Sequence, residues 1–190
     1  MEIANPDIKK LVDIAKEKGL ETPHTRYEKQ KGKCKFGKSG ICCVTCAEGP
    51  CRLTEKSPYG VCGLNADQIV ARNLLRRVAA GTACYVHVCE NTARALAYTD
   101  VKNDKLEEVC SILGIEPDPR KLSEFVLADL YRPRWESSVI VQKVGFEKRL
   151  EVFRKLDIIP GGAKAEIVDA LVKTSTNLNS NVVDLLLHVL

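Results

Sequence analysis

Six of the nine cysteines of this chain lie within twenty-nine residues, and this crowding constrains the fold more than any other feature. Their spacing is C-x7-C-C-x2-C-x4-C-x10-C, from Cys34 to Cys62. Thiols at this density form disulfides or bind metal. The sequence shows no signal-peptide pattern, and 190 residues of which 45% are hydrophobic can bury a core without covalent cross-links. We therefore expect metal ligands in a reducing, cytoplasmic compartment.

The spacing distinguishes an iron–sulfur cluster from a zinc site. Structural zinc sites generally use two C-x2-C pairs, or one such pair with a later cysteine or histidine pair, and here only Cys43 and Cys46 form one. A cubane [4Fe-4S] cluster takes four thiolates, several from one tight loop and one from farther along the chain. That pattern is matched by Cys43, Cys46, Cys51 and Cys62. We predict one [4Fe-4S] cluster per chain, with a zinc-binding interaction module as the alternative.

The two remaining cysteines of the run predict a second cluster. Adjacent side chains of an extended segment point to opposite sides, so Cys42 and Cys43 are poorly placed to bind one small cluster. Cys34 and Cys42 supply half the ligands of a cubane, and an identical chain across a two-fold axis would supply the other half. We therefore expect a homodimer that shares a second iron–sulfur cluster, [4Fe-4S] or [2Fe-2S]. The alternative is that both are free thiols of a loop.

The rest of the sequence is typical of helices. Asn5 and Pro6 begin an amphipathic helix that ends near Gly19, and a short helix begins at Pro23. A long helix is predicted over 65–98, with these residues directed to a core: Ile69, Val70, Leu74, Val78 and Leu96. Further helices are predicted over 104–113, 120–130, 145–156, 163–173 and 181–190. We expect one all-α domain over 1–190, with an irregular cysteine-rich cluster-binding loop over 32–63.

Other features receive structural interpretations. Cys84, Cys89 and Cys110 stand in helical, apolar contexts, where a free cysteine is typically a small buried hydrophobe. The cysteine loop contains few apolar residues, so we expect metal binding and local folding to be one event.

Lysines around Cys34 would steer an acidic electron carrier or simply be solvated: Lys29, Lys31, Lys33, Lys35 and Lys38. Nucleic acid is a poor fit because the formal net charge is only +4, and no transmembrane run is present.

Several segments resemble those of a known family. They are CKFGKSGICCVTCAEGPCR at 34–52, GVCG at 60–63, IVARN at 69–73, RYE at 26–28, AAG at 79–81, IIPGG at 158–162 and DLLLH at 184–188. Together they resemble the N-terminal domain of anaerobic nickel-containing carbon monoxide dehydrogenases, over essentially the whole chain. Hybrid-cluster proteins are a related alternative, but their spacing lacks the adjacent Cys42 and Cys43.

The resemblance implies cofactors and partners. In that family the cysteines matching Cys43, Cys46, Cys51 and Cys62 hold the [4Fe-4S] B-cluster. Those matching Cys34 and Cys42 hold the D-cluster, which bridges two subunits. The family oxidises CO with water to CO2, two protons and two electrons at a nickel–iron–sulfur C-cluster, whose ligands lie in later domains that this chain lacks. The resemblance thus implies an electron-transfer and dimerisation domain of an oxidoreductase, without catalytic residues, that serves a ferredoxin-like carrier.

One departure from the family pattern concerns protons. Many members carry a histidine ladder after Ala-Ala-Gly, and the matching positions here are Tyr85, Val88, Asn91 and Arg94. His87 is out of register, and one histidine makes no relay. The final residues continue an apolar helical pattern without a stop signal. We therefore expect a fragment, or a chain whose catalytic domains lie downstream or in a partner chain.

Overall fold

The computed structural model describes residues 3–30, 32, 34–175 and 178–190, which fall into two compact units, Met1–Ser39 and Gly40–Leu190. The first unit contains α1 (Pro6–Glu17), α2 (Pro23–Lys29) and α3 (Lys35–Ser39). The second begins with an antiparallel pair of two-residue strands, β1 (Cys42–Cys43) and β2 (Cys51–Arg52). Its helices are α4 (Ala66–Leu96), α5 (Asp104–Leu113), α6 (Pro119–Leu130), α7 (Val139–Val144), α8 (Glu147–Leu156), α9 (Ala163–Lys173) and α10 (Val182–Val189). The predicted all-α class is confirmed, and the single domain over 1–190 stays a prediction.

The first unit is built from capped short helices. Asn5 accepts hydrogen bonds from the amides of Asp7 and Ile8 and so begins α1, as the sequence predicts. Thr22 caps α2 in a reciprocal pair with Thr25. The sequence reading missed α3, a single turn that starts after Cys34. Among the described residues of α1 only Val12 is buried, so most of the apolar face of this amphipathic helix is exposed within its unit.

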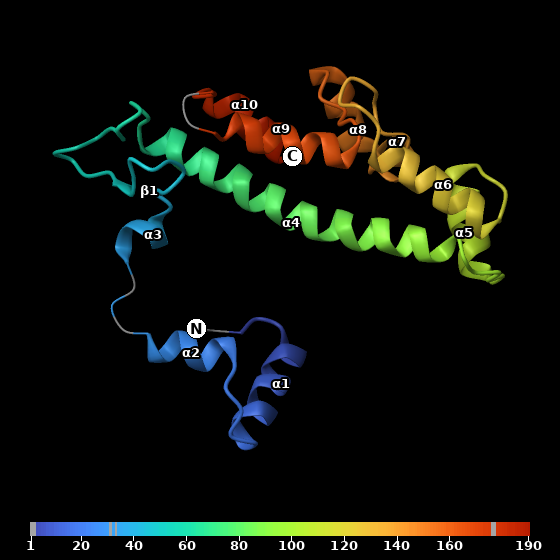
Figure 1. The fold of residues 1–190 in the computed structure, drawn as a ribbon, viewed down its shortest axis with the longest axis horizontal. Helices are drawn as coiled ribbons and strands as arrows, with labels where there is room; N and C mark the ends of the chain where they lie inside the picture. The colour runs from blue at the N-terminus through green and yellow to red at the C-terminus, as the bar shows by residue number, and fades with distance from the viewer. Residues whose placement is uncertain (1–2, 31, 33, 176–177) are drawn as a thin grey trace. The chain divides into compact units, whose positions relative to one another are not determined.

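The second unit is organised along α4, the long green helix of Figure 1. Asn65 and Gln68 form a capping box that fixes its first turn. Helices α9 and α10 contact α4 toward its start, and α6 contacts it toward its end (Figure 1). The side chain of Arg72 is buried between α4 and α9, where Nε and Nη2 donate to the Thr174 carbonyl at 3.2 and 2.7 Å. This carbonyl belongs to the C-cap of α9, where helix carbonyls carry partial negative charge.

The buried stripe of α4 differs from the predicted one. It runs through Ala71, Leu75 and Ala79, which pack against α9 and α10. Ile69 is buried as predicted, but Val70 and Leu74 are 39% and 41% exposed, so their assignment to the core is wrong. The buried stripe follows positions spaced by four residues, and Val70 and Leu74 each stand one residue before it, about 100° around the helix.

The cysteines outside the loop divide between core and surface. Cys110 is completely buried between α5 and α6, beside Leu106, Leu113 and Leu122. Its predicted core role is confirmed. Cys84 and Cys89 are exposed, so the same prediction is wrong for them. The buried side of α4 in that region passes through Val86 and Ala93 instead.

The sequence also missed α7. Ser138 caps this helix by accepting a hydrogen bond from the Val141 amide at 3.1 Å. The buried carboxylate of Asp129 holds the same turn, because it accepts from the Ser138 hydroxyl at 2.6 Å and the Val139 amide at 2.7 Å. Six residues are too few to show a helical period, which explains the omission. None of the described helices combines the length and apolarity needed to cross a bilayer.

Glu90 joins three parts of the second unit. Its carboxylate accepts hydrogen bonds from Arg94 at 2.9 Å and the Tyr131 hydroxyl at 2.5 Å, and it pairs with Lys164 at 2.6 Å. Lys164 also lies 4.1 Å from the centroid of the Tyr131 ring. These contacts lower the pKa of Glu90 to about 2, and the hydrogen bond from Lys164 is the largest cause. The carboxylate therefore links α4 to α9 and to the end of α6.

We expect Glu90→Gln to lower the melting temperature at neutral pH and to lose this effect in acid. The pKa of Glu90 is depressed from 4.5 to about 2, so the carboxylate stabilises the fold above about pH 4.5, and the contribution disappears as the pH falls toward about 2. Thermal unfolding followed by circular dichroism across this range measures the difference. Glu107→Gln, at an exposed position of α5, should melt like the parent chain. A Glu90→Gln deficit that persists undiminished in acid would contradict the assignment.

Candidate metal centre

The paired strands place the adjacent cysteines on opposite faces. Cys43 lies opposite Cys51 in the antiparallel register, and Cys42 lies opposite Arg52. Directly opposed residues share a face, and successive residues alternate, so Cys43 and Cys51 point one way and Cys42 the other. Cys43 is 8% exposed, whereas Cys42 is half-buried. Cys42 and Cys43 therefore have the extended geometry expected from the sequence.

Three of the four cysteines predicted to bind one cluster belong to a single apolar group. Cys43 is buried with Leu53, Leu64 and Ile69, and the half-buried Cys51 and Cys62 pack against them. The fourth, Cys46, is half-buried in the loop between the strands. The loop thus contains a small apolar group, and the coupling of metal binding to local folding stays a prediction.

One backbone N–H group contacts the sulfur of Cys51. The Val61 amide donates to Cys51 Sγ at 3.5 Å. Gly60 lies beside the same sulfur, and a Cβ at this position would make ordinary van der Waals contact with it at 3.6 Å and with Ile69 Cδ1 at 3.7 Å. On the other strand the Cys43 thiol donates to Thr45 Oγ1 at 3.4 Å. Amides directed at sulfur stabilise thiolates and tune clusters.

Gly49 is required by a close approach. A Cβ there would lie 2.9 Å from the carbonyl oxygen of Cys43 and 3.4 Å from both the Cys46 carbonyl oxygen and the Cys51 amide nitrogen. The Gly49 amide donates to the Cys46 carbonyl at 3.2 Å, and the following Gly49–Pro50 peptide is cis. The tight return that brings Cys43 and Cys51 opposite each other therefore leaves no room for a side chain at 49.

The donor set fits an iron–sulfur cluster in its chemistry. Its soft thiolates come from one tight loop, lie in apolar surroundings and receive a backbone N–H, which is the environment of such clusters. Among the described residues, no group of three or more His, Cys, Asp and Glu side chains converges closely enough to hold a single metal ion. A four-iron cluster is larger than one ion, and its ligands stand farther apart.

The second predicted pair spans both units. Cys34 precedes α3 in the first unit, where its carbonyl accepts from the Lys38 amide at 3.0 Å. Cys42 belongs to the second unit, and the sharing of one cluster by these two residues stays a prediction. Of the surrounding lysines, Lys35 and Lys38 are exposed and Lys29 pairs with Glu21. Lys31 and Lys33 lie outside the described residues.

Sequence reasoning missed the role of Asn73. This residue ends the IVARN segment, and its side-chain amide donates to the carbonyls of Gly40 at 2.8 Å and Cys42 at 3.0 Å. The available signal was spacing, since Asn73 lies one helical turn after the buried Ile69. His87, in contrast, is exposed, and its Nε2 lies 3.0 Å from the side-chain amide nitrogen of Asn91.

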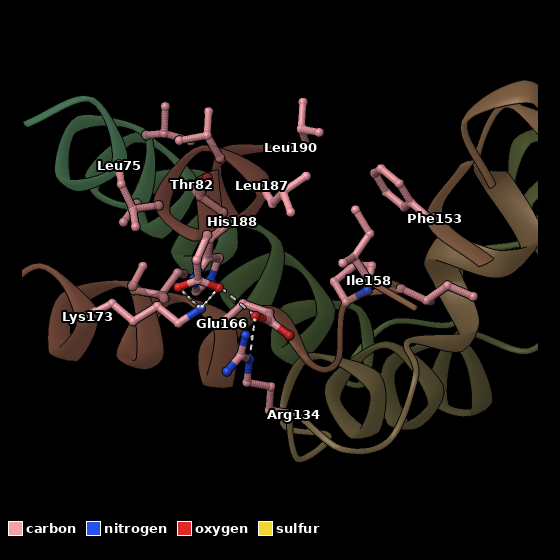
Figure 2. A pocket seen from close by; sticks show the side chains of 18 of the residues that line it. Leu75, Thr82, Arg134, Phe153, Ile158, Glu166, Lys173, Leu187, His188 and Leu190 are labelled. Atoms are coloured by element: carbon pink, nitrogen blue, oxygen red, sulfur yellow. Dashed lines mark hydrogen bonds and ion pairs between the residues drawn. The ribbon is translucent and has the colours of Figure 1, made fainter. Parts of the chain in front are cut away.

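A separate cavity of about 660 Å³ lies between α4, α8, α9 and α10. Figure 2 shows apolar side chains such as Leu75, Phe153 and Leu187 around it, with His188 and Glu166 at its polar side. Burial by itself raises the pKa of Glu166, but His188, the Gly161 amide and Arg134 together lower it below its usual value.

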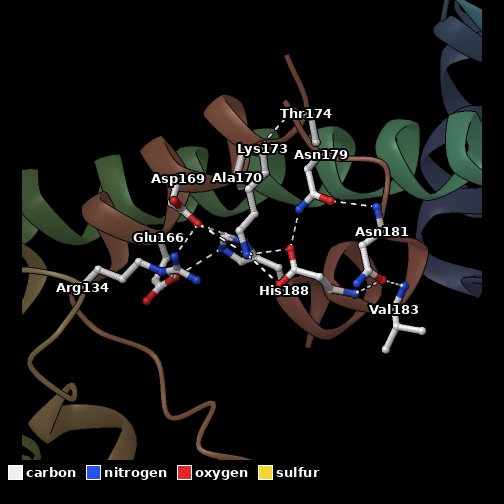
Figure 3. A network of polar contacts seen from close by, with 11 residues as sticks. Arg134, Glu166, Asp169, Ala170, Lys173, Thr174, Asn179, Asn181, Val183 and His188 are labelled. Carbon is white, nitrogen blue, oxygen red and sulfur yellow. Dashed lines mark hydrogen bonds and ion pairs between the residues drawn. The ribbon is translucent and has the colours of Figure 1, made fainter. Parts of the chain in front are cut away.

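Ion pairs along this cavity join α9 to α10 (Figure 3). Asp169 pairs with Arg134 at 2.8 Å and lies 3.7 Å from Lys173. Lys173 reaches Asp184 at 3.0 Å, and His188 lies 3.2 Å from Glu166 and 3.5 Å from Asp169. Each of the three carboxylates, Glu166, Asp169 and Asp184, lies within ion-pair distance of Arg134 or Lys173. We interpret it as a structural connection between the two helices.

The structure is a helical domain with a cysteine hairpin at the start of its long helix, formed by β1, β2 and the loop between them. Comparison with known proteins gives its family. The model of the Prismane/CO dehydrogenase family matches residues 41–190. The chain belongs to this family, and the resemblance found in its sequence is confirmed.

Individual relatives agree. A carbon monoxide dehydrogenase of Methanocaldococcus jannaschii is 57% identical over 98% of this chain and 32% of the relative. The structure of carbon monoxide dehydrogenase IV from Carboxydothermus hydrogenoformans has a TM-score of 0.80 at 30% identity, over 97% of this chain and 32% of the other. An acetyl-CoA synthase/carbon monoxide dehydrogenase with NiZn[Fe4S4] and NiNi[Fe4S4] clusters in its alpha subunits has a TM-score of 0.82 at 27% identity, over 98% and 31%. The chain spans about a third of the length of these relatives.

We expect Gly49→Ala to disrupt the cysteine hairpin. The added Cβ would press on the Cys43 carbonyl, which is backbone and can move only if the strand shifts. The variant should melt at a lower temperature and retain less iron after anaerobic reconstitution. Gly81→Ala is the matched control, because a Cβ at this position on α4 meets nothing within 4 Å. Alanine there should stabilise the helix by about 0.5–1 kcal/mol. Equal behaviour of the two variants would contradict the close approach at Gly49.

Proposed function

We propose that this chain is the iron–sulfur electron-transfer and dimerisation domain of an anaerobic carbon monoxide dehydrogenase. The observation that carries the proposal is the cysteine hairpin on α4, with three thiols in one apolar group, in a chain of the Prismane/CO dehydrogenase family. In the whole enzyme the reaction would be the oxidation of CO with water to CO2, two protons and two electrons. The Ni–Fe–S cluster of that reaction would be held by residues outside this chain, in a reducing cytoplasm.

Within the chain, one [4Fe-4S] cluster would be held by Cys43, Cys46, Cys51 and Cys62. When bound, such a cluster accepts and releases one electron at a time. The chain's own contribution is the setting. Leu53, Leu64 and Ile69 exclude water on the buried side of the thiols. The Val61 amide donates to Cys51 Sγ, which stabilises negative charge on that sulfur.

The shared cluster would be held by Cys34 and Cys42 from each of two chains. Cys42 is directed away from the face that carries Cys43, so its thiol is available to a different cluster. An isologous dimer brings identical residues together at its axis, and two thiolates from each chain complete a cubane. One cluster per chain on either side of a shared one would form a continuous electron path. A ferredoxin-like carrier with an acidic surface would dock near Lys35 and Lys38.

The alternatives differ in metal content. A zinc-binding interaction module would contain zinc and lack visible absorbance, and a hybrid-cluster-type domain would contain iron without a shared cluster. The apolar setting of the thiols and the backbone N–H directed at Cys51 Sγ favour iron over zinc. Metal analysis separates the three possibilities.

We expect the anaerobically reconstituted chain to contain about six irons, because its own cluster contributes about four and half of a shared [4Fe-4S] cluster contributes about two. A shared [2Fe-2S] cluster would give about five. Serine at any of positions 43, 46, 51 or 62 should remove the cluster held within the chain. The Cys34→Ser, Cys42→Ser double variant should keep about four irons and dimerise more weakly.

Iron and acid-labile sulfide per chain, with mass from light scattering, measure these outcomes. Cys84→Ser is the matched control, since this exposed thiol lies on α4 outside the hairpin. It should leave iron content unchanged. Unchanged iron in the double variant would overturn the shared cluster, and one zinc with no iron in the parent chain would overturn the proposal as a whole.

We also expect the chain alone to bind no nickel and to show no CO-dependent reduction of a viologen dye. The candidate ligand set of this chain is composed of thiols suited to iron–sulfur clusters, and the family resemblance places the nickel ligands in later domains. Nickel analysis and an anaerobic dye assay test this directly. Dye reduction by the pure chain, above a boiled control, would show that a complete active site lies within these residues.

A further inference from the structure

Asn73 holds the polypeptide on both sides of Ile41. Its Nδ2 donates one hydrogen bond to the Gly40 carbonyl at 2.8 Å and another to the Cys42 carbonyl at 3.0 Å. A side-chain amide nitrogen has two N–H groups, so this nitrogen is fully used by two backbone acceptors. The acceptors lie 31 and 33 residues earlier in the chain, so the contact is tertiary.

The same face of α4 also carries Ile69, which packs in the apolar group around Cys43. Ile69 is one helical turn before Asn73, is 1% exposed and packs in the group that contains Cys43. Between them, Val70 Cγ2 would lie 3.7 Å from a Cβ at Gly40, whose φ is +75°. The helix therefore contacts the hairpin at two points. The side chain of Ile69 packs in the apolar group of Cys43, Cys51 and Cys62, which we call the inner thiols. The side-chain amide of Asn73 binds the backbone carbonyls on either side of Ile41.

This second contact matters because the ladder of the hairpin contributes little to fixing its register. Strands β1 and β2 are two residues long, so the ladder offers few hydrogen bonds against sliding. A shift of one residue turns every side chain of a strand to the other face. In β1 that shift would exchange Cys42 and Cys43, and each thiol would point toward the place of the other.

We propose that Asn73 is a positioning residue that fixes the register of β1, so that Cys43 faces the other inner thiols and Cys42 faces outward. The inference rests on the proposed function for the meaning of these two faces, and its test reads the positions of the two thiols before any cluster is assembled. The amide is suited to the task because it presents two donors to two carbonyls. An aspartate of nearly the same shape would present only acceptors and repel both.

The test compares the reactivity of the two thiols in the metal-free, reduced chain. Brief treatment with iodoacetamide, followed by mass spectrometry of proteolytic peptides, gives the alkylation rate of each cysteine. In the parent chain Cys43 should react much more slowly than Cys42, because it is 8% exposed and the other is half-buried. In Asn73→Asp and Asn73→Ala the alkylation rate of Cys42 divided by that of Cys43 should fall by about tenfold, because two hydrogen bonds of ordinary strength are lost.

Asn91→Asp is the matched control, because Asn91 is on the same helix and does not contact the hairpin carbonyls. It should keep the parent ratio. Far-UV circular dichroism identifies any variant that fails to fold, and Asn73→Ala, which introduces no charge, then decides. An unchanged ratio in a folded Asn73 variant would overturn the positioning role, even if the parent chain binds iron normally. A parent chain that shows the ratio but takes up no iron would overturn the proposed function and leave the positioning role intact.

Discussion

The contact between the cysteine hairpin and the first turns of α4 is the interaction on which the candidate site depends. Asn65 and Gln68 fix where the helix starts, and that start determines which way Ile69 points. Gln68 also donates to the Ser180 carbonyl at 3.0 Å, which ties the segment before α10 to the same turn. The capping box thus positions both the hairpin and α10 at the start of α4. A shift of this cap would disturb the hairpin and α10 together.

The buried Arg72 shows how the middle of this arrangement is held. A guanidinium removed from water needs compensation, and here the oxygen comes from the C-cap of α9 rather than from a carboxylate. Arg76 adds a hydrogen bond to the Thr174 hydroxyl at 3.1 Å. Because this pairing depends on the end of a helix, it fixes the length of α9 and its position along α4. Small residues at 71 and 79 make that close packing possible.

The sequence predicted the elements with strong local signals. The cap at Asn5 locates the start of α1, and the helices predicted over 104–113 and 120–130 begin within one residue of α5 and α6. Cysteine spacing identifies the candidate ligands, because the ligands of such a cluster are cysteines at characteristic spacings. It did not predict the two-residue strands, since nothing periodic appears at that length. It misassigned Val70 and Leu74 because hydrophobicity does not reveal which face of the helix packs against its neighbours. The bond of Asn73 to Cys42 depends on tertiary proximity, which no pattern along one chain contains.

The exposure of Cys84 and Cys89 has a practical consequence for the study of assembly. Both thiols lie on the surface of α4 within the described chain, where oxygen and other molecules can reach them. In air, an exposed cysteine of one molecule can be oxidised and then form a disulfide with that of another. Chains handled aerobically would therefore pair covalently through α4, and such a pair would survive the removal of iron. A dimer that persists in the presence of a chelator but dissociates when a reductant is added is held by this disulfide. It gives no evidence for a cluster that bridges two chains.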